Sequence, residues 1–138
     1  MSAAASSGCS GKPVWQKLGI KPGLRLRVEG APADYAALVG LDAEAIHPVG
    51  PRAAFDLLHL FVTEATVLQR RLLALSKSLP ASAVVWVSWP KKSSGVPTDV
   101  TEDTIRHHAL PLGLVDIKVC AVDATWSGLK LVWRTSMR

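Results

Sequence analysis

The chain has 138 residues, of which 49% are hydrophobic and 20% charged, and its formal net charge is +5 at pH 7. This length accommodates one domain with a single core, and the composition excludes an intrinsically disordered chain. The apolar runs fall well short of the roughly 20 residues that a transmembrane helix requires, so we predict no membrane span.

The positive charge is dispersed along the sequence. Of the sixteen lysine and arginine residues, only Arg70-Arg71 and Lys91-Lys92 are adjacent pairs. No nucleic-acid-binding motif accompanies the charge, so a solvated basic surface is the favoured interpretation, and nucleic acid is not a predicted partner.

The cysteines and the first residues bear on the compartment. Cys9 and Cys120 show no spacing typical of a metal or redox site, which favours a reduced, cytoplasmic setting. Residues 1–11 are small and polar, and they lack the basic start and apolar centre of a secretory signal. We therefore expect a flexible tail at residues 1–11 and one domain at residues 12–138.

The first part of the chain predicts two short strands with a helix between them. Residues 21–23 form a turn, and residues 24–28 alternate with the period of a strand. A helix is expected at residues 32–39, with proline near its start and glycine just past its end. A brief second strand is expected at residues 45–49.

The middle of the chain predicts a buried strand followed by an amphipathic helix. Residues 55–62 are almost unbroken in apolar side chains, which indicates cover on both faces of the sheet. Thr63 is expected to cap the helix, with Glu64 in its first turn. The apolar residues of this helix recur every three or four positions and define its sheet-facing side; they are Ala65, Leu68, Leu72, Leu75 and Leu79.

The last part of the chain predicts a strand, a helix and a hairpin. Residues 83–87 form an apolar strand that Pro90 ends, and Thr101 caps the helix that follows. Residues 115–122 and 128–134 are strand-like and lie close enough in sequence to form a hairpin.

This alternation of strands and helices predicts an α/β domain. We expect a mostly parallel sheet with helices on both faces and a C-terminal antiparallel hairpin strand. In such a sheet, ligands bind outside the carboxyl ends of the parallel strands. Four loops are expected at this edge, namely residues 29–34, 63–64, 89–99 and 123–127.

The strand at residues 83–87 runs almost directly into a polar loop. Lys91, Lys92, Ser93, Ser94 and Gly95 supply the ammonium, hydroxyl and backbone N–H groups that bind phosphate or carboxylate. The loop is not a P-loop, because the glycines of that motif do not precede the lysines. A solvated surface loop accounts for the two lysines equally well.

Aromatic and acidic residues are expected beside this loop. Trp89 and Trp126 are predicted to face each other across the edge, where an indole stacks on a base, although core packing is favoured for at least one of them. Asp99 and Asp123 are expected near the lysines, with capping or neutralisation favoured over acid–base chemistry. Ser127 completes the predicted ligand-binding set.

No group of residues identifies a reaction. His59 lies within an apolar strand and is interpreted as a hydrogen-bonded core residue. His107 and His108 are adjacent on a helix, whereas metal ligands on one helix are three or four positions apart, so no metal site is predicted. A Gly-x-Ser-x-Gly elbow is also missing, and whether the protein is an enzyme stays open.

Residues 17–23, together with Gly113-Leu114-Val115 and Trp126-Ser127-Gly128, carry a resemblance to a known family. From Lys17 onward the chain resembles a family of small bacterial proteins catalogued as a domain of unknown function, a resemblance that implies no activity. The order of elements also resembles a trimmed S-adenosylmethionine-dependent methyltransferase. That architecture is a Rossmann-like three-layer sandwich.

Three functions are compatible with these observations. The leading hypothesis is a binding domain for a small anionic or nucleotide-like ligand at the carboxyl edge of the sheet. One alternative is a divergent S-adenosylmethionine-dependent methyltransferase. The other is a non-catalytic interaction subunit that pairs with another chain, including a second copy, through an exposed terminal hairpin that carries Trp133.

Overall fold

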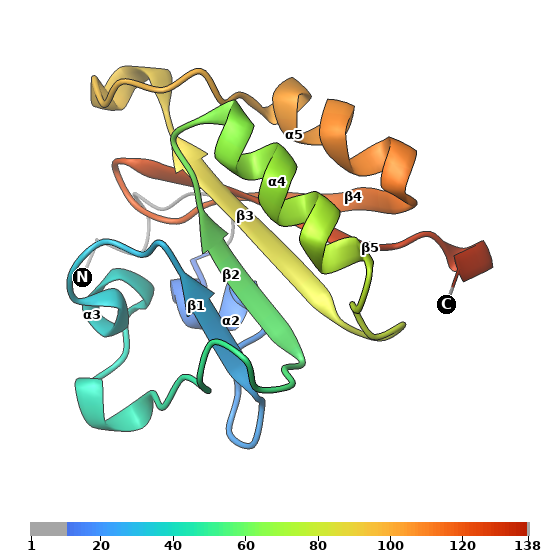
Figure 1. Ribbon diagram of the computed structural model, residues 1–138. Helices are drawn as coiled ribbons and strands as arrows, with labels where there is room; N and C mark the ends of the chain where they lie inside the picture. Colours follow the sequence, from blue (N-terminus) through green and yellow to red (C-terminus); the bar gives the residue numbers. More distant parts are fainter. Residues whose placement is uncertain (1–10, 138) are drawn as a thin grey trace.

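The computed structural model describes residues 11–137, so Cys9 and nearly all of the expected tail lie outside the described residues (Figure 1). A five-stranded sheet forms the centre; its strands are β1 (Leu26–Glu29), β2 (Leu57–Phe61), β3 (Val84–Pro90), β4 (Leu114–Ala121) and β5 (Trp126–Trp133). Their order is β1-β2-β3-β5-β4. The first three strands are parallel, and β5 runs antiparallel to both β3 and β4, so the sheet is mixed.

Helices flank the sheet, which confirms the α/β class. They are α2 (Val14–Leu18), α3 (Tyr35–Val39), α4 (Ala65–Ser76) and α5 (Glu102–Ala109), with 3-10 turns η1 (Ala43–Ala45), η2 (Lys92–Ser94), η3 (Leu110–Leu112) and η4 (Thr135–Met137). In Figure 1, α4 and α5 lie side by side across one face of the sheet. No helix within residues 11–137 is long and apolar enough to cross a membrane.

Two apolar cores follow from the alternation of side chains along the strands. In β2, Leu58 and Leu60 join the core beneath α4 and α5, whereas Leu57 joins a second core with residues of α2 and α3. In β3, Val87 and Trp86 divide in the same way. Both faces of the central strands are therefore covered, as their almost continuous apolar sequences predict.

The strand predicted at residues 45–49 is wrong. Ala45 is the last residue of η1, and residues 46–49 form no strand, although the Val49 N–H donates to the Leu26 carbonyl of β1 at 2.8 Å. Pro48 has no amide hydrogen, and Gly50 and Pro51 follow immediately, so a longer ladder is not favoured here. Helix α2, in contrast, was not predicted from the sequence.

The cap predicted for α4 is also wrong, whereas the cap of α5 is confirmed. Asp99 Oδ1 accepts the Ala65 N–H at 2.7 Å, so a residue from a distant loop caps α4 in place of Thr63. In α5, Thr101 Oγ1 accepts the Thr104 N–H, and the Thr104 hydroxyl accepts the Thr101 N–H in return.

Arg106 fastens α5 to the neighbouring strand. Its guanidinium forms ion pairs with Glu102 and Asp103 of the same helix and with Asp116 of β4. Hydrogen bonds that the guanidinium donates to Asp116 and Glu102 raise the pKa of Arg106 further above its ordinary value. The helix is thereby held over the outer part of the sheet.

The hairpin edge differs from the expectation in one respect. Trp133 is buried, and its indole N–H donates to the Leu79 carbonyl at 3.0 Å, so the predicted exposure of this residue is wrong. The exposed apolar residues of edge strand β4 are Ile117 and Val119. The register shifts between Asp116 and Lys118, an irregularity of the kind that disfavours pairing with another strand.

Candidate functional site

The carboxyl ends of β1, β2 and β3 meet at one edge of the sheet, and the β4–β5 loop joins them because β4 runs in the same direction. Two pairs of loops are joined by hydrogen bonds. The Lys91 N–H donates to the Thr125 carbonyl at 2.8 Å, and the Thr98 hydroxyl donates to the Thr63 carbonyl at 2.6 Å. The loops expected at this edge therefore do come together.

The loop after β1 crosses directly over the end of β2. Gly30 has φ +71°, and a Cβ atom at this position would lie 2.7 Å from the carbonyl oxygen of Phe61. Only glycine combines this backbone conformation with so close an approach. The contact fixes the loop of residues 29–34 against the rest of the edge.

We expect Gly30→Ala to lower the free energy of unfolding by about 2 kcal/mol, since a methyl group must enter a left-handed conformation and displace backbone. Gly23→Ala is a matched control, because Gly23 has φ +85° but open space around it. It should lose about 1 kcal/mol. Urea unfolding of both variants measures the difference, and equal losses would show that the Phe61 contact is unimportant.

The polar loop after β3 forms a compact turn. The Ser94 hydroxyl donates to the Lys91 carbonyl at 2.7 Å and accepts the Val96 N–H at 3.2 Å, so this hydroxyl is used by the turn itself. Gly95 adopts φ +76° at its end. Lys91 is partly buried, and Lys92 and Ser93 are exposed. Within residues 11–137, neither lysine has a carboxylate within ion-pair distance.

The two aspartates predicted beside the lysines stabilise loops. Asp123 Oδ1 accepts the N–H groups of Thr125 and Trp126 at 2.8 and 2.7 Å. Asp99 caps α4 and also lines a hollow of about 320 Å³ together with Thr63, Thr98 and neighbouring residues. Of the structural roles that the sequence favoured, neutralisation or capping, Asp99 has the capping role, and Asp123 accepts N–H groups of its own loop.

The two tryptophans lie on opposite faces of the sheet, so the prediction that they face each other is wrong. Trp89 is paired with Ser127 across the antiparallel ladder. Residues directly opposite share a face, which places the neighbouring Trp126 on the other one. Trp89 is buried in the core beneath α4 and α5. Trp126 is partly exposed and meets the Phe61 ring edge-on, with centroids 5.0 Å apart.

A buried hydrogen-bonded chain links α3 to β2 and β3. Tyr35 Oη lies 2.7 Å from His59 Nδ1, and His59 Nε2 lies 2.7 Å from Ser88 Oγ. The His59 ring stacks on Phe61 with a centroid distance of 4.2 Å. Sequence analysis recognised His59 as a core residue but identified neither partner.

The charge state of the hydrogen-bonded Tyr35, His59 and Ser88 side chains follows from their burial. His59 is fully buried, and burial lowers its pKa to about 3, so the imidazole is neutral near pH 7. Burial also raises the pKa of the Tyr35 hydroxyl. Since both imidazole nitrogens are occupied by protein groups, the arrangement holds α3 and the preceding loop on the sheet. The position of a polar residue within an apolar strand was the sequence signal that marked His59, and Ser88 in β3 carries the same signal although it was not identified.

Metal ligands are not assembled in the part of the chain that the structure describes. No group of three or more histidine, cysteine, aspartate or glutamate side chains lies close enough there to hold a metal ion. Cys120 is buried within the second core. The described groups at the carboxyl edge therefore include lysine ammonium groups, hydroxyls, backbone amides, one partly exposed indole, and the carboxylates of Asp99 and Asp123, both of which accept backbone N–H groups.

No protein-family model matches the sequence, and no curated protein is detectably similar to it. Among solved structures, a cysteine-to-alanine variant of LepI in complex with SAH and a substrate analogue is similar, with a TM-score of 0.51 and 12% identity over 88% of this chain. A LepI complex with SAM has a TM-score of 0.48 and 14% identity over 87% of this chain. The chain spans 39% of the LepI chain in each case. The first likeness concerns the fold alone and is consistent with a methyltransferase-like architecture.

Proposed function

We propose that this protein is a binding domain for a small anionic, nucleotide-like ligand, which it holds at the carboxyl edge of the sheet. The proposal treats residues 12–138 as a single Rossmann-like domain. The observation that carries it is the lysine turn, in which Lys91 and Lys92 lack ion-pair partners among the described residues while the Lys91 amide fastens the turn to the β4–β5 loop.

An anion is the ligand class that this turn favours. Two ammonium groups that form no ion pair with the described carboxylates can donate charge-assisted hydrogen bonds to phosphate or carboxylate oxygens. Ser93 adds an exposed hydroxyl that no hydrogen bond of the turn requires. Because the turn is fastened to Thr125, the lysines extend from a defined backbone.

The partly exposed Trp126 favours a ligand that contains a flat ring. The indole is partly exposed and is braced edge-on by Phe61, which leaves aromatic surface for stacking. In β3, Pro90 is paired with Trp126, so this indole lies one residue along the strand from the start of the lysine turn. Trp89 has no part in the proposed site, because it is buried on the other face.

S-adenosylmethionine or its demethylated product is the second candidate ligand. The fold-level likeness to LepI, which was solved with SAH, favours it. The loop after β1 is Glu29-Gly30-Ala31-Pro32-Ala33-Asp34, with one glycine where methyltransferases place a glycine-rich loop. The support for S-adenosylmethionine or its product is therefore the fold, whereas the support for a small anionic ligand is the lysine turn at residues 91–95.

Titration calorimetry with ADP and with SAH tests both candidates. Lys91→Ala/Lys92→Ala is expected to weaken ADP binding at least tenfold, because two charge-assisted hydrogen bonds are lost, and added salt should weaken binding to the parent protein. Lys77→Ala/Lys118→Ala removes the same charge from exposed positions elsewhere and should leave ADP affinity within twofold.

Two outcomes would contradict the leading proposal. One is the absence of measurable binding heat with ADP at millimolar concentration. The other is an equal loss of ADP affinity in both double variants. Heat on SAH addition, with unchanged affinity in Lys91→Ala/Lys92→Ala, would support the second candidate instead.

A further inference from the structure

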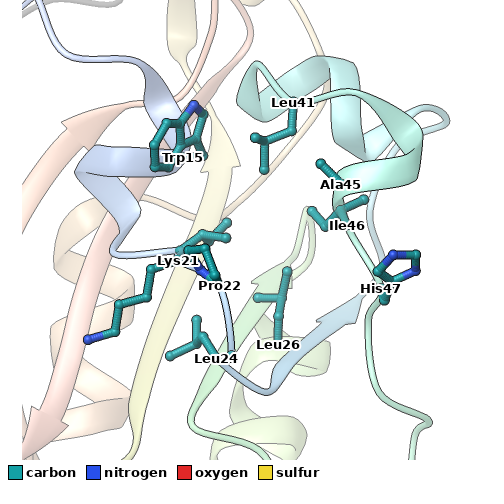
Figure 2. A pocket seen from close by; sticks show the side chains of 11 residues that line it. Trp15, Lys21, Pro22, Leu24, Leu26, Leu41, Ala45, Ile46 and His47 are labelled. Atoms are coloured by element: carbon teal, nitrogen blue, oxygen red, sulfur yellow. The ribbon is translucent and has the colours of Figure 1, made fainter.

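A cavity of about 410 Å³ lies beside the amino-terminal half of β1, away from the lysine turn. Three segments form its walls: α2 with the turn that follows it, the start of β1, and the chain from Leu41 to His47 (Figure 2). Figure 2 shows Trp15 and Pro22 on one side, Leu41 and Ile46 on the other, and Leu26 between them. None of these residues belongs to the carboxyl-edge site.

Each wall is fixed by backbone hydrogen bonds. The Ile20 N–H donates to the Trp15 carbonyl at 2.9 Å, which closes the turn after α2. The Leu41 N–H donates to the Ala36 carbonyl at 2.8 Å, and the Val49 bond to Leu26 holds the third segment along β1. The cavity is therefore a preformed feature of the fold, as ligand pockets usually are.

The interior of the cavity is apolar. Trp15, Leu24, Leu41 and Ile46 are only partly buried, although all four pack against the second core. The volume falls within the range of about 300 to 1,000 Å³ that is typical of small-molecule sites. Apolar side chains that remain partly open around a hollow of this size mark a binding site for an apolar molecule.

The titratable groups at the mouth of the cavity are basic. Lys21 and His47 line it, and no aspartate or glutamate does so. Figure 2 shows the Lys21 ammonium and the His47 ring outside the cluster of apolar side chains. Lys21 lowers the pKa of Asp56 slightly, but Arg25 already holds that carboxylate at 2.8 Å. A second anion near Lys21 is therefore electrostatically favourable.

We propose that this cavity binds a small apolar carboxylic acid, with its hydrocarbon part among the apolar side chains and its carboxylate beside Lys21. The site is separate from the carboxyl edge, and the proposal does not depend on the ligand proposed there. A medium-chain fatty acid represents the class, because it combines a flexible apolar body with a single acidic head.

Calorimetric titration of the full chain with octanoate and with 1-octanol tests the proposal. We expect octanoate to bind with one-to-one stoichiometry. Ala45→Trp places a large side chain at an exposed position that lines the cavity, and it should weaken octanoate binding at least tenfold. Ala43→Trp is the matched control, because Ala43 lies exposed in the same 3-10 turn but does not line the cavity. It should leave binding within twofold.

The acidic head is tested by Lys21→Gln. This variant should weaken octanoate binding at least threefold and leave 1-octanol binding unchanged. Silence toward octanoate, or equal effects of Ala45→Trp and Ala43→Trp, would overturn the site, and 1-octanol binding as tight as octanoate binding would overturn the carboxylate assignment. Light scattering that shows a dimer dispersed by Ala45→Trp would identify a second copy as the occupant and would also overturn the proposal.

Discussion

Replacement of Trp86 by alanine is expected to lower the free energy of unfolding by about 3 to 5 kcal/mol, the range for removing a large aromatic side chain from a packed core. Trp86 is fully buried in the second core, and its indole N–H donates to the Leu18 carbonyl at 2.9 Å. Its loss removes a large, fully buried side chain from the core that α2 shares, together with the hydrogen bond at the end of that helix. Urea unfolding followed by far-UV circular dichroism measures the change.

Trp86→Phe separates the two contributions. Phenylalanine retains much of the apolar surface but leaves the Leu18 carbonyl without the indole donor, which should lower the free energy of unfolding by about 1 to 3 kcal/mol. A loss below 1 kcal/mol for Trp86→Ala would show that α2 contributes little to stability and that the sheet retains its packing without it.

Acidification from pH 7 to pH 4.5 is expected to remove roughly 2.5 kcal/mol of stability through His59 alone. The folded pKa is about 3 because the ring is buried, whereas the unfolded chain titrates near the ordinary value of about 6.5. Between these values the unfolded state binds a proton that the folded state does not. The contribution of neutral His59 is therefore complete above pH 6.5 and is lost as the pH falls toward 3.

The matched variant for this prediction is His59→Gln, whose amide also offers one donor and one acceptor to Tyr35 and Ser88. It should be less stable than the parent at pH 7, because the ring stack on Phe61 is lost, but its stability should fall less steeply with acid. The Asp56 carboxyl, whose pKa Arg25 lowers, titrates in both proteins and cancels in the difference. Parallel stability curves between pH 7 and pH 4.5 would contradict the assignment.

The elements that sequence analysis located correctly are those whose signal is local. The apolar runs at β2 and β3 and the three-to-four spacing from Ala65 to Leu79 each lie within a single continuous segment of the chain. Thr101 caps α5 through a neighbour three positions away, so its role is also legible in the sequence. Burial on both faces follows from the same unbroken apolarity.

The features that sequence analysis missed depend on contacts between distant segments. The α4 cap comes from Asp99, which is 34 positions away from Ala65, so Thr63 was the nearer but incorrect choice. The relative faces of Trp89 and Trp126 depend on the register between β3 and β5, and a shift of one residue would place both indoles on the same face. His59 and Ser88 likewise meet through the parallel pairing of β2 with β3, and Tyr35 reaches His59 from α3.

For the candidate site, the sequence predicted which loops converge but not the role of each side chain within them. Convergence of the four loops follows from strand direction, which the alternation of elements indicates. The use of Ser94, Asp99 and Asp123 in turns and caps could not be distinguished from ligand binding in the sequence, because the same side chains serve both purposes. The cavity beside the amino-terminal half of β1, which Trp15 helps to line, had no sequence signal, because its three walls lie on separate segments.

The position of β5 between β3 and β4 has a consequence for biosynthesis. During translation, β3 can pair with β2 as soon as both are synthesised, but its second partner strand, β5, is complete only after residue 133 has been added. Until then the nascent chain presents an unpaired strand edge and the apolar surface that Leu129 and Leu131 later cover. We therefore expect a chaperone to bind this exposed surface during translation, before β5 pairs with β3 and completes the sheet.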